Sequence, residues 1–93
     1  MRVSWDPRKA KANFLKHGFR FSDAEGVLFD PLALTREDVT STSEQRFVTI
    51  GIDYLGRLVV VVYAQRDEDL RLVSARHATR KERRQYEEGV RLQ

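Results

Sequence analysis

The sequence predicts an α+β domain in which helices pack on an antiparallel sheet. Two helix-start patterns lie near the N-terminus, strand patterns separated by short turns follow them, and one more helix-start pattern comes after the last strand. The expected order is therefore a strand, two helices, a short strand, three further strands and a final helix, which is typical of an α+β fold. We expect residues 1–93 to form a single domain, because this length suits one modest core.

A short strand over residues 2–5 is followed by the signals of a first helix. Asp6 is a preferred N-cap residue, and Pro7 fits the first turn because its missing N–H would have no partner there. Gly18 can take the left-handed conformation that ends many helices. We therefore expect this helix to run to about His17.

A second, shorter helix is expected next. Ser22 and Glu25 have the spacing of a capping box, in which two side chains satisfy unpaired N–H groups at a helix start. Ala24 and Val27 would then face inward. Pro31 should end the helix, since the residue before a proline is pushed out of the helical region.

Strand patterns occupy most of the middle of the chain. Residues 32–35 are a candidate short strand, and the polar residues 36–43 are expected to form a mobile loop. Residues 46–52 alternate, so one face of this strand should be apolar. Residues 58–63 are apolar throughout, as expected for a central strand that is covered on both faces. Residues 70–76 also alternate and would complete an antiparallel meander.

The junction after the last strand combines a helix start with concentrated positive charge. Thr79 and Glu82 have the spacing of a second capping box, which predicts a final helix that extends to about Gly89. Arg76 lies at the end of the strand, directly before this basic helix, and a guanidinium in that position suits phosphate binding. The alternative interpretation is an ordinary surface helix with solvated charges.

The composition excludes several classes of protein. There is no cysteine, so disulfides and thiolate metal sites are excluded and a reducing compartment is suitable. No apolar run approaches the length that spans a membrane, and the N-terminus lacks the apolar core of a signal peptide. We expect a soluble, cytoplasmic protein that does not act at a membrane.

Positive charge is concentrated at the two ends of the chain. The net charge is +3. Residues 1–20 contain six Lys or Arg and one acidic residue, and residues 70–93 contain seven Lys or Arg and three acidic residues. The middle of the chain, residues 21–69, contains four Lys or Arg and ten acidic residues. The two ends would form one anion-binding face if the fold brought them together. The alternative, in which the ends point apart, remains open.

Elimination narrows the chemistry. Metal catalysis has little support, because His17 and His77 lie sixty residues apart and no carboxylate cluster accompanies them. There is no glycine-rich phosphate loop, and Ser74 lies within a strand rather than on a sharp turn. What remains is arginine with His, Glu or Tyr partners. This set suits RNA cleavage without a metal or another cofactor, in which the 2′-hydroxyl attacks its own phosphate and cations stabilise the phosphorane.

Two residues have alternative interpretations. His17 could transfer protons or bind a phosphate, or it could be a histidine that the dipole favours at a helix C-terminus. Trp5 could stack on an RNA base or anchor the core beside a helix cap.

The sequence resembles the BrnT family of bacterial type II toxins, over a span from Trp5 to Tyr86. The residues that carry the likeness include Trp5-Asp6-Pro7, Lys9, Asn13, Lys16-His17-Gly18, Phe21, Glu44, Arg46, Gly56-Arg57-Leu58, Arg71 to Arg76, Ala78-Thr79-Arg80, Glu82-Arg83 and Tyr86. The resemblance implies a RelE-like fold and a ribonuclease activity that inhibits translation. It also implies neutralisation by a BrnA-type antitoxin. The toxin would contact operator DNA only through that antitoxin.

The resemblance also implies roles for individual residues. RelE-like toxins place one arginine at the start of a central strand and another at the end of the last strand, positions held here by Arg46 and Arg76. Tyr86 is the candidate for a tyrosine that some members use, and His77 stands where lysine is more usual. We expect Arg46 and Arg76 to stabilise the phosphate and His17 to act as acid or base. The basic residues expected to bind the RNA backbone are Lys9, Lys16, Arg80 and Arg84.

Two other classes of function remain open. The protein could be a catalytically inactive module that only binds its partner protein, or a plain RNA-binding domain. Only a nuclease would produce discrete cuts in RNA.

Overall fold

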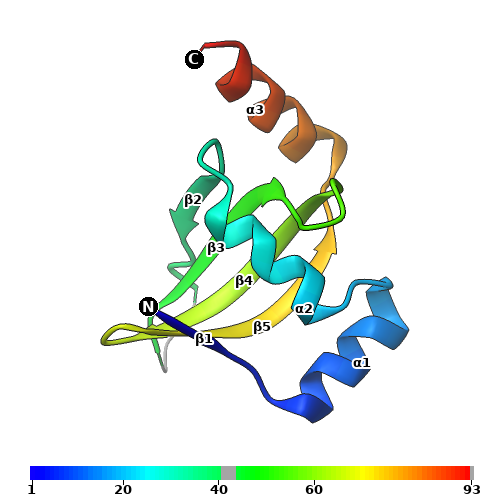
Figure 1. Cartoon of the computed structure of the whole chain (residues 1–93). Helices are drawn as coiled ribbons and strands as arrows, with labels where there is room; N and C mark the ends of the chain where they lie inside the picture. The colour runs from blue at the N-terminus through cyan, green and yellow to red at the C-terminus, as the bar shows by residue number, and fades with distance from the viewer. Residues whose placement is uncertain (41–43, 93) are drawn as a thin grey trace.

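The computed structural model describes residues 1–40 and 44–92 of the chain. Figure 1 shows a twisted sheet with helices beside it and across it. The elements in chain order are β1 (Arg2–Ser4), α1 (Pro7–His17), α2 (Phe21–Ala24), the 3₁₀ helix η1 (Glu25–Phe29), β2 (Leu34–Glu37), β3 (Arg46–Ile52), β4 (Leu58–Arg66), β5 (Asp69–His77) and α3 (Arg80–Arg91). Within these residues no helix is long and apolar enough to cross a membrane.

The sheet is mixed, with the strand order β1-β5-β4-β3-β2. Strands β2 to β5 form the antiparallel meander that the sequence predicts, but β1 pairs with β5 in parallel. The expectation of a wholly antiparallel sheet is therefore wrong for β1. Strand direction has no signature in side-chain alternation, and here it depends on how the chain returns to the sheet after the intervening helices.

The central strand is β4, as its apolar run predicts. Val59, Val60 and Val61 are all fully buried because each face of β4 is covered by a separate apolar cluster. The first cluster joins β4 and β5 to the segment that contains α2 and η1; its buried members include Phe19, Phe21, Val27 and Leu72. The second joins β3 and β4 to α3; its buried members are Val48, Ile50, Leu58, Val60 and Tyr86.

Helix α1 begins and ends where its capping signals predict. The Asp6 carboxylate accepts the backbone N–H of Arg8 at 2.8 Å, and Gly18 ends the helix at φ 79°. Asn13 is buried because its amide pairs with the outer edge of β5: Oδ1 accepts the N–H of Ala75 at 3.0 Å, and Nδ2 donates to the Ala75 carbonyl at 2.9 Å. This side chain takes the place of a neighbouring strand and fixes α1 beside the sheet.

The second predicted helix starts and ends differently. It begins at Phe21, one residue before Ser22, has no side-chain cap, and continues from Glu25 as a 3₁₀ helix. The predicted capping box of Ser22 and Glu25 is therefore wrong. Burial of the Phe21 ring and of Ala24 determines where the helix begins, and core packing outweighs the local capping preference.

Strand β2 lies later in the chain than predicted, and the predicted loop is correspondingly shorter. Pairing with β3 runs from Leu34 opposite Ile50 to Glu37 opposite Phe47, so residues 36 and 37 belong to the strand and not to a loop. Beyond it, the Asp38 carboxylate accepts the backbone N–H of Thr40 in a tight turn. Residues 41–43 of the predicted mobile loop lie outside the described part of the chain.

A β-bulge interrupts the alternation of β5. Val62 pairs with Ser74 and Tyr63 pairs with Leu72, so Val73 is an extra residue on β5. The predicted pattern, with Leu72 and Ser74 on one face, is therefore wrong after the bulge: Ala75 joins Leu72 in the first cluster instead. The bulge turns the next residue, Arg76, toward the opposite face and toward α3.

Helix α3 starts at the predicted capping box and ends two residues beyond the predicted Gly89. Thr79 accepts the N–H of Glu82 at 3.1 Å, and the Glu82 carboxylate accepts the N–H of Thr79 at 2.9 Å. Tyr86 is the buried residue of this helix and anchors it in the second cluster. The rest of α3 extends away from the sheet (Figure 1).

Candidate active site

Three arginines converge on Glu44 at the end of the sheet where β3 begins. Nε and Nη2 of Arg46 donate to Oε1 of Glu44 at 3.3 and 3.2 Å. Nη2 of Arg71 donates to Oε2 at 3.4 Å, and Nη2 of Arg66 lies 3.9 Å from the same oxygen. We call these four residues the arginine cluster. The Glu44 side chain is 13% exposed, whereas Arg46, Arg71 and Arg66 are 32%, 47% and 75% exposed, so the cationic groups face solvent around a mostly covered carboxylate.

Strand register builds the arginine cluster. Arg46 pairs with Ala64 of β4, Ala64 pairs with Arg71 of β5, and Arg71 pairs with Ser4 of β1. This row crosses four adjacent strands, with a small alanine between the two arginines. A hollow of about 130 Å³ lies here, lined by Ser4, Ala64, Arg66, Asp69 and Arg71. Guanidinium groups beside such a hollow suit an anion with several oxygens, since each guanidinium can donate two parallel hydrogen bonds.

Only one member of the arginine cluster was predicted as a site residue. The sequence predicts a role for Arg46 but none for Glu44, Arg66 or Arg71. Glu44 is two residues before Arg46, and that spacing could have suggested a contact along one strand face. No signal in the sequence shows that Arg71, 27 residues from Glu44, reaches the same carboxylate, because that contact depends on the register of two hairpins.

Arg76 lies in a different environment from Arg46. Its Nη1 and Nη2 donate to the two oxygens of Glu82 at 2.8 and 3.0 Å, and Nη1 also donates to the His77 carbonyl at 3.1 Å. The hydrogen bond from Arg76 is the main reason that the pKa of Glu82 falls to about 2, and the same bond raises the pKa of Arg76. Arg76 therefore joins the end of β5 to the first turn of α3.

The structure does not bring Arg46 and Arg76 to one place. Their partners on β4 are Ala64 and Val60, four residues apart, which corresponds to about 13 Å along the sheet. The two arginines share a face of the sheet but cannot hold the same phosphate in this conformation. In this structure they contact different carboxylates, Glu44 and Glu82, and a two-arginine clamp on one phosphate, like the catalytic role of each residue, remains a prediction.

The structure gathers His17, Lys9 and Lys16 in one groove, which lies between α1 and β5. The groove has a volume of about 250 Å³ and is lined by Lys9, Ala12, Asn13, Lys16, His17, Val73 and Ser74. Among the described residues, no hydrogen bond or ion pair joins His17 to Arg46 or Arg76, and no three His, Asp or Glu side chains are placed to hold a metal ion. The groove can attract a polyanion along α1.

The two basic ends of the chain form separate surfaces. Helix α1 lies beside β5, whereas α3, which carries Arg80 and Arg84, extends from the sheet in another direction (Figure 1). The ends approach each other where the rings of Phe19 and His77 meet edge to face, with centroids 4.6 Å apart. Over most of their length α1 and α3 therefore point apart, as the alternative interpretation expects.

Tyr86 has the environment of a structural residue. Its hydroxyl donates to Oδ2 of Asp30 at 2.6 Å. Burial is the largest cause that raises the pKa of Tyr86 to about 12, and this hydrogen bond is the second. Burial also acts to raise the pKa of Asp30, but hydrogen bonds from Tyr86, Leu32 and Ile52 outweigh it and leave that pKa below its ordinary value. Tyr86 is 8% exposed and fastens α3 to the turn before β2.

Comparisons with known proteins agree with this architecture. Residues 5–82 match the family described as the ribonuclease toxin BrnT of type II toxin–antitoxin systems. A crystal structure of the Brucella abortus ribonuclease toxin BrnT superposes with a TM-score of 0.66 and 26% sequence identity, covering 86% of this chain and 99% of that one. Among curated proteins, none matches the chain. Because the family match spans most of the sequence, the chain belongs to the BrnT family of ribonuclease toxins of type II toxin–antitoxin systems.

Proposed function

We propose that this toxin cleaves RNA at the arginine cluster without a metal ion and thereby inhibits translation. The observation that carries the proposal is the convergence of Arg46, Arg66 and Arg71 on Glu44. Three guanidinium groups surround one carboxylate at this end of the sheet, and Asp69, the acid that lines the hollow, pairs with Arg2, so the group carries excess positive charge. That charge is what the dianionic phosphorane of RNA cleavage requires.

The proposed reaction uses the substrate's own nucleophile. The RNA 2′-oxygen forms a bond to phosphorus, the bond from phosphorus to the 5′-oxygen breaks, and a 2′,3′-cyclic phosphate remains. Arg46 and Arg71 would donate to the non-bridging oxygens from either side of Ala64. The Glu44 carboxylate would accept the 2′-hydroxyl proton, since its arginine partners hold it where the phosphate would bind. A solvent proton would complete the leaving 5′-hydroxyl.

His17 has a different place in this proposal from the one predicted. It lies in the α1/β5 groove with Lys9 and Lys16, and within the described part of the chain no hydrogen bond or ion pair joins it to Arg46, Arg66 or Arg71. We assign these three residues to binding the RNA backbone, together with Arg80 and Arg84 on α3. Such contacts raise affinity and its salt dependence more than they change the chemical step.

The partner in this proposal is an antitoxin of the BrnA type. An exposed cationic surface favours association with a complementary chain, and operator DNA would be contacted only through that chain. Co-expression with the product of an adjacent gene should yield a complex that persists at moderate salt. If no partner co-purifies and induction of the toxin alone leaves growth unchanged, neutralisation by an antitoxin is not the biology of this protein.

One experiment tests the activity directly. Purified protein is incubated with a defined RNA in excess EDTA, and the ends of the products are mapped. We expect discrete cuts that leave 2′,3′-cyclic phosphate, because the internal hydroxyl needs no metal-bound water. Loss of cleavage in EDTA with recovery in Mg²⁺ would contradict the mechanism. Binding of RNA without any cut would instead favour a plain RNA-binding domain, and neither binding nor cleavage would favour an inactive partner-binding module.

A further inference from the structure

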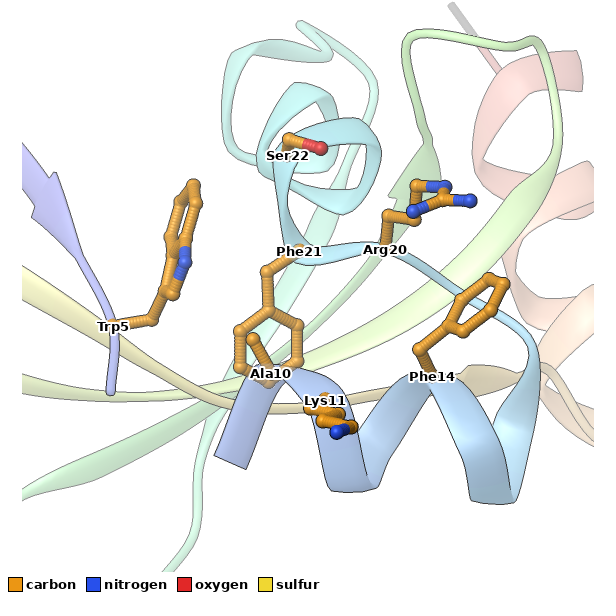
Figure 2. A pocket seen from close by; sticks show the side chains of 7 residues that line it. All are labelled: Trp5, Ala10, Lys11, Phe14, Arg20, Phe21 and Ser22. Atoms are coloured by element: carbon orange, nitrogen blue, oxygen red, sulfur yellow. The ribbon is translucent and has the colours of Figure 1, made fainter. Parts of the chain in front are cut away.

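A groove between α1 and the start of α2 is separate from both sites described above. Its volume is about 300 Å³, and its lining residues are Trp5, Ala10, Lys11, Phe14, Arg20, Phe21 and Ser22 (Figure 2). Helix α1 separates it from the α1/β5 groove: Lys9 and Lys16 line one flank of the helix, and Lys11 and Phe14 line the other. We call it the aromatic groove.

Aromatic rings form the floor and two sides of the aromatic groove. Phe21 is 2% exposed and lies at the base, with the Trp5 ring meeting it edge-on at a centroid distance of 6.0 Å and an interplanar angle of 77°. Trp5 and Phe14 stand on opposite sides of the hollow in Figure 2. Phe14 is 38% exposed, so part of its ring is open to solvent at the groove. One edge of Trp5 thus anchors the core while the side chain also lines the groove.

The charged groups at this groove are both cations. The guanidinium carbon of Arg20 lies 4.4 Å from the centroid of the Phe14 ring, a cation–π contact, and Lys11 stands on the adjacent turn of α1. Among the described residues, neither Lys11 nor Arg20 forms an ion pair, and no lining residue is acidic. The acid next to Ser22 in sequence is Asp23, whose carboxylate lies 3.8 Å from Arg57. The groove therefore offers flat apolar faces and two cations that are free to bind an anion.

We propose that the aromatic groove binds one unpaired nucleotide of the RNA substrate, with its base against Trp5 and Phe14 and its phosphate between Lys11 and Arg20. This inference rests on the proposed function, since it gives the substrate a second point of attachment away from the cut. Single-stranded RNA is recognised in this way, by stacking of splayed bases on aromatic rings and arginine planes. Cations on both flanks of α1 would let the strand cross the helix.

A nucleotide fits these observations better than a protein segment does. A peptide in extended form needs unpaired backbone groups, but the N–H and C=O groups along α1 are already bonded within the helix. An amphipathic helix needs a long apolar groove, whereas this hollow is short and has cations beside its rings. A planar base with an attached phosphate uses both the rings and the charges.

The single tryptophan of the chain gives a direct readout. The probe is a hexaadenylate with 2′-O-methyl groups, which cannot be cleaved because its 2′-oxygens are blocked. Titration should quench Trp5 fluorescence. Phe14→Leu removes the ring but keeps an apolar side chain, and Arg20→Gln removes the charge; each should weaken binding of the probe about tenfold, as loss of one stacking or charge contact implies.

Matched control variants lie on the same helix. Leu15→Ala changes an apolar residue that is 76% exposed and does not line the groove, and Arg8→Gln removes one positive charge outside it. Arg8→Gln should reduce affinity less than Arg20→Gln, and Leu15→Ala should leave both affinity and quenching unchanged. Equal weakening by Arg8→Gln and Arg20→Gln would show general electrostatic attraction and overturn the proposal.

Failure of the groove and failure of the nuclease assignment give different results. Suppose that the wild-type protein cuts unmodified RNA, but the probe does not quench Trp5 fluorescence and Phe14→Leu does not change the affinity for the probe. The groove proposal is then overturned and the proposed function stands. If quenching and both variant effects are present but no RNA is cut, the groove binds RNA and the nuclease assignment fails. If an acidic, aromatic-containing peptide quenches Trp5 and the oligonucleotide does not, the groove is a protein-binding site and the proposal is overturned.

Discussion

Arg46 and Arg76 occupy matching positions in the sequence pattern, one at the start of a central strand and one at the end of the last strand. Arg76 has one carboxylate to itself: Glu82 receives both of its Nη groups at 2.8 and 3.0 Å. Arg46 shares Glu44 with Arg66 and Arg71. The first arrangement balances one charge with another, and the second leaves cations in excess.

The difference between the two arginines teaches how to separate a structural charge from a functional one. A bidentate pair between two elements stabilises their docking, and its charges largely cancel. A cluster with more guanidinium than carboxylate groups gives less stability per charge but attracts an anion. Position at a strand end does not distinguish the two cases, whereas the number of acidic partners does.

Arg46→Ala should have the largest effect of any change in this comparison. We expect the single-turnover cleavage rate to fall by about 10²–10³, as for the loss of one preorganised donor to a phosphorane. The melting temperature should change little, because Glu44 keeps Arg71 and Arg66. Arg91→Ala, on the exposed last turn of α3, is the control for loss of an arginine and should retain the wild-type rate. A rate unchanged by Arg46→Ala would remove the arginine cluster from the mechanism.

Arg76→Ala should act mainly on stability. The variant leaves the Glu82 carboxylate without its closest cation. Because the Arg76 side chain is 33% exposed, solvent screens part of this interaction, and we expect the free energy of unfolding to fall by roughly 1–2 kcal/mol. For a chain of this size, each kcal/mol lowers the melting temperature by about 4–8 °C.

The readout for Arg76→Ala is thermal unfolding together with cleavage measured below the transition. Arg76→Ala should cost less stability in a Glu82→Ala background than in the wild type, since the pair is already broken there, although Glu82→Ala itself also loses the capping bond to Thr79. A fall in cleavage rate as large as that of Arg46→Ala, with an unchanged melting temperature, would support the two-arginine clamp that the family resemblance implies.

Tyr86→Phe should have a smaller effect on stability and none on cleavage. The variant removes the 2.6 Å hydrogen bond to Asp30, which keeps its bonds from Ile52 and Leu32. We expect a loss of about 1 kcal/mol, measured by denaturant unfolding. The opposite pattern, with full stability and a large loss of cleavage, would support the catalytic tyrosine that the family resemblance suggests.

A further expected effect is a dependence of stability on acid pH. The pKa of Glu82 falls from 4.5 to about 2 on folding, mainly through the hydrogen bond from Arg76. A carboxyl group with a lowered folded-state pKa contributes stability above its unfolded pKa and loses that contribution as the pH falls toward the folded value. The melting temperature should therefore decline between pH 4.5 and about 2.

Glu82→Gln isolates the contribution of this carboxyl group, because other acids also titrate in the same range. The variant should begin with a lower melting temperature at neutral pH, and the difference from wild type should shrink as the pH approaches 2. A difference that stays constant across this range would mean that the charge on Glu82 contributes nothing to docking of α3.

Much of the secondary structure follows from the sequence alone. Asp6, Gly18 and the pair Thr79 and Glu82 mark helix ends correctly, because each cap is a contact between residues only a few positions apart. The apolar run that begins at Leu58 marks the central strand, because a strand covered on both faces has no polar positions to alternate with. The family also follows from the sequence, through motifs at both ends of the chain.

The arrangement of the site required the tertiary structure. The bulge at Val73 decides which face Arg76 takes, and the alternation of side chains along β5 does not reveal it. Arg71 reaches Glu44 across 27 residues, and Asn13 reaches Ala75 across 62. Such contacts depend on strand register and on the packing of the whole core. Sequence patterns report the conformation of a segment, whereas the partner that a charged side chain meets is set by segments far away in the chain.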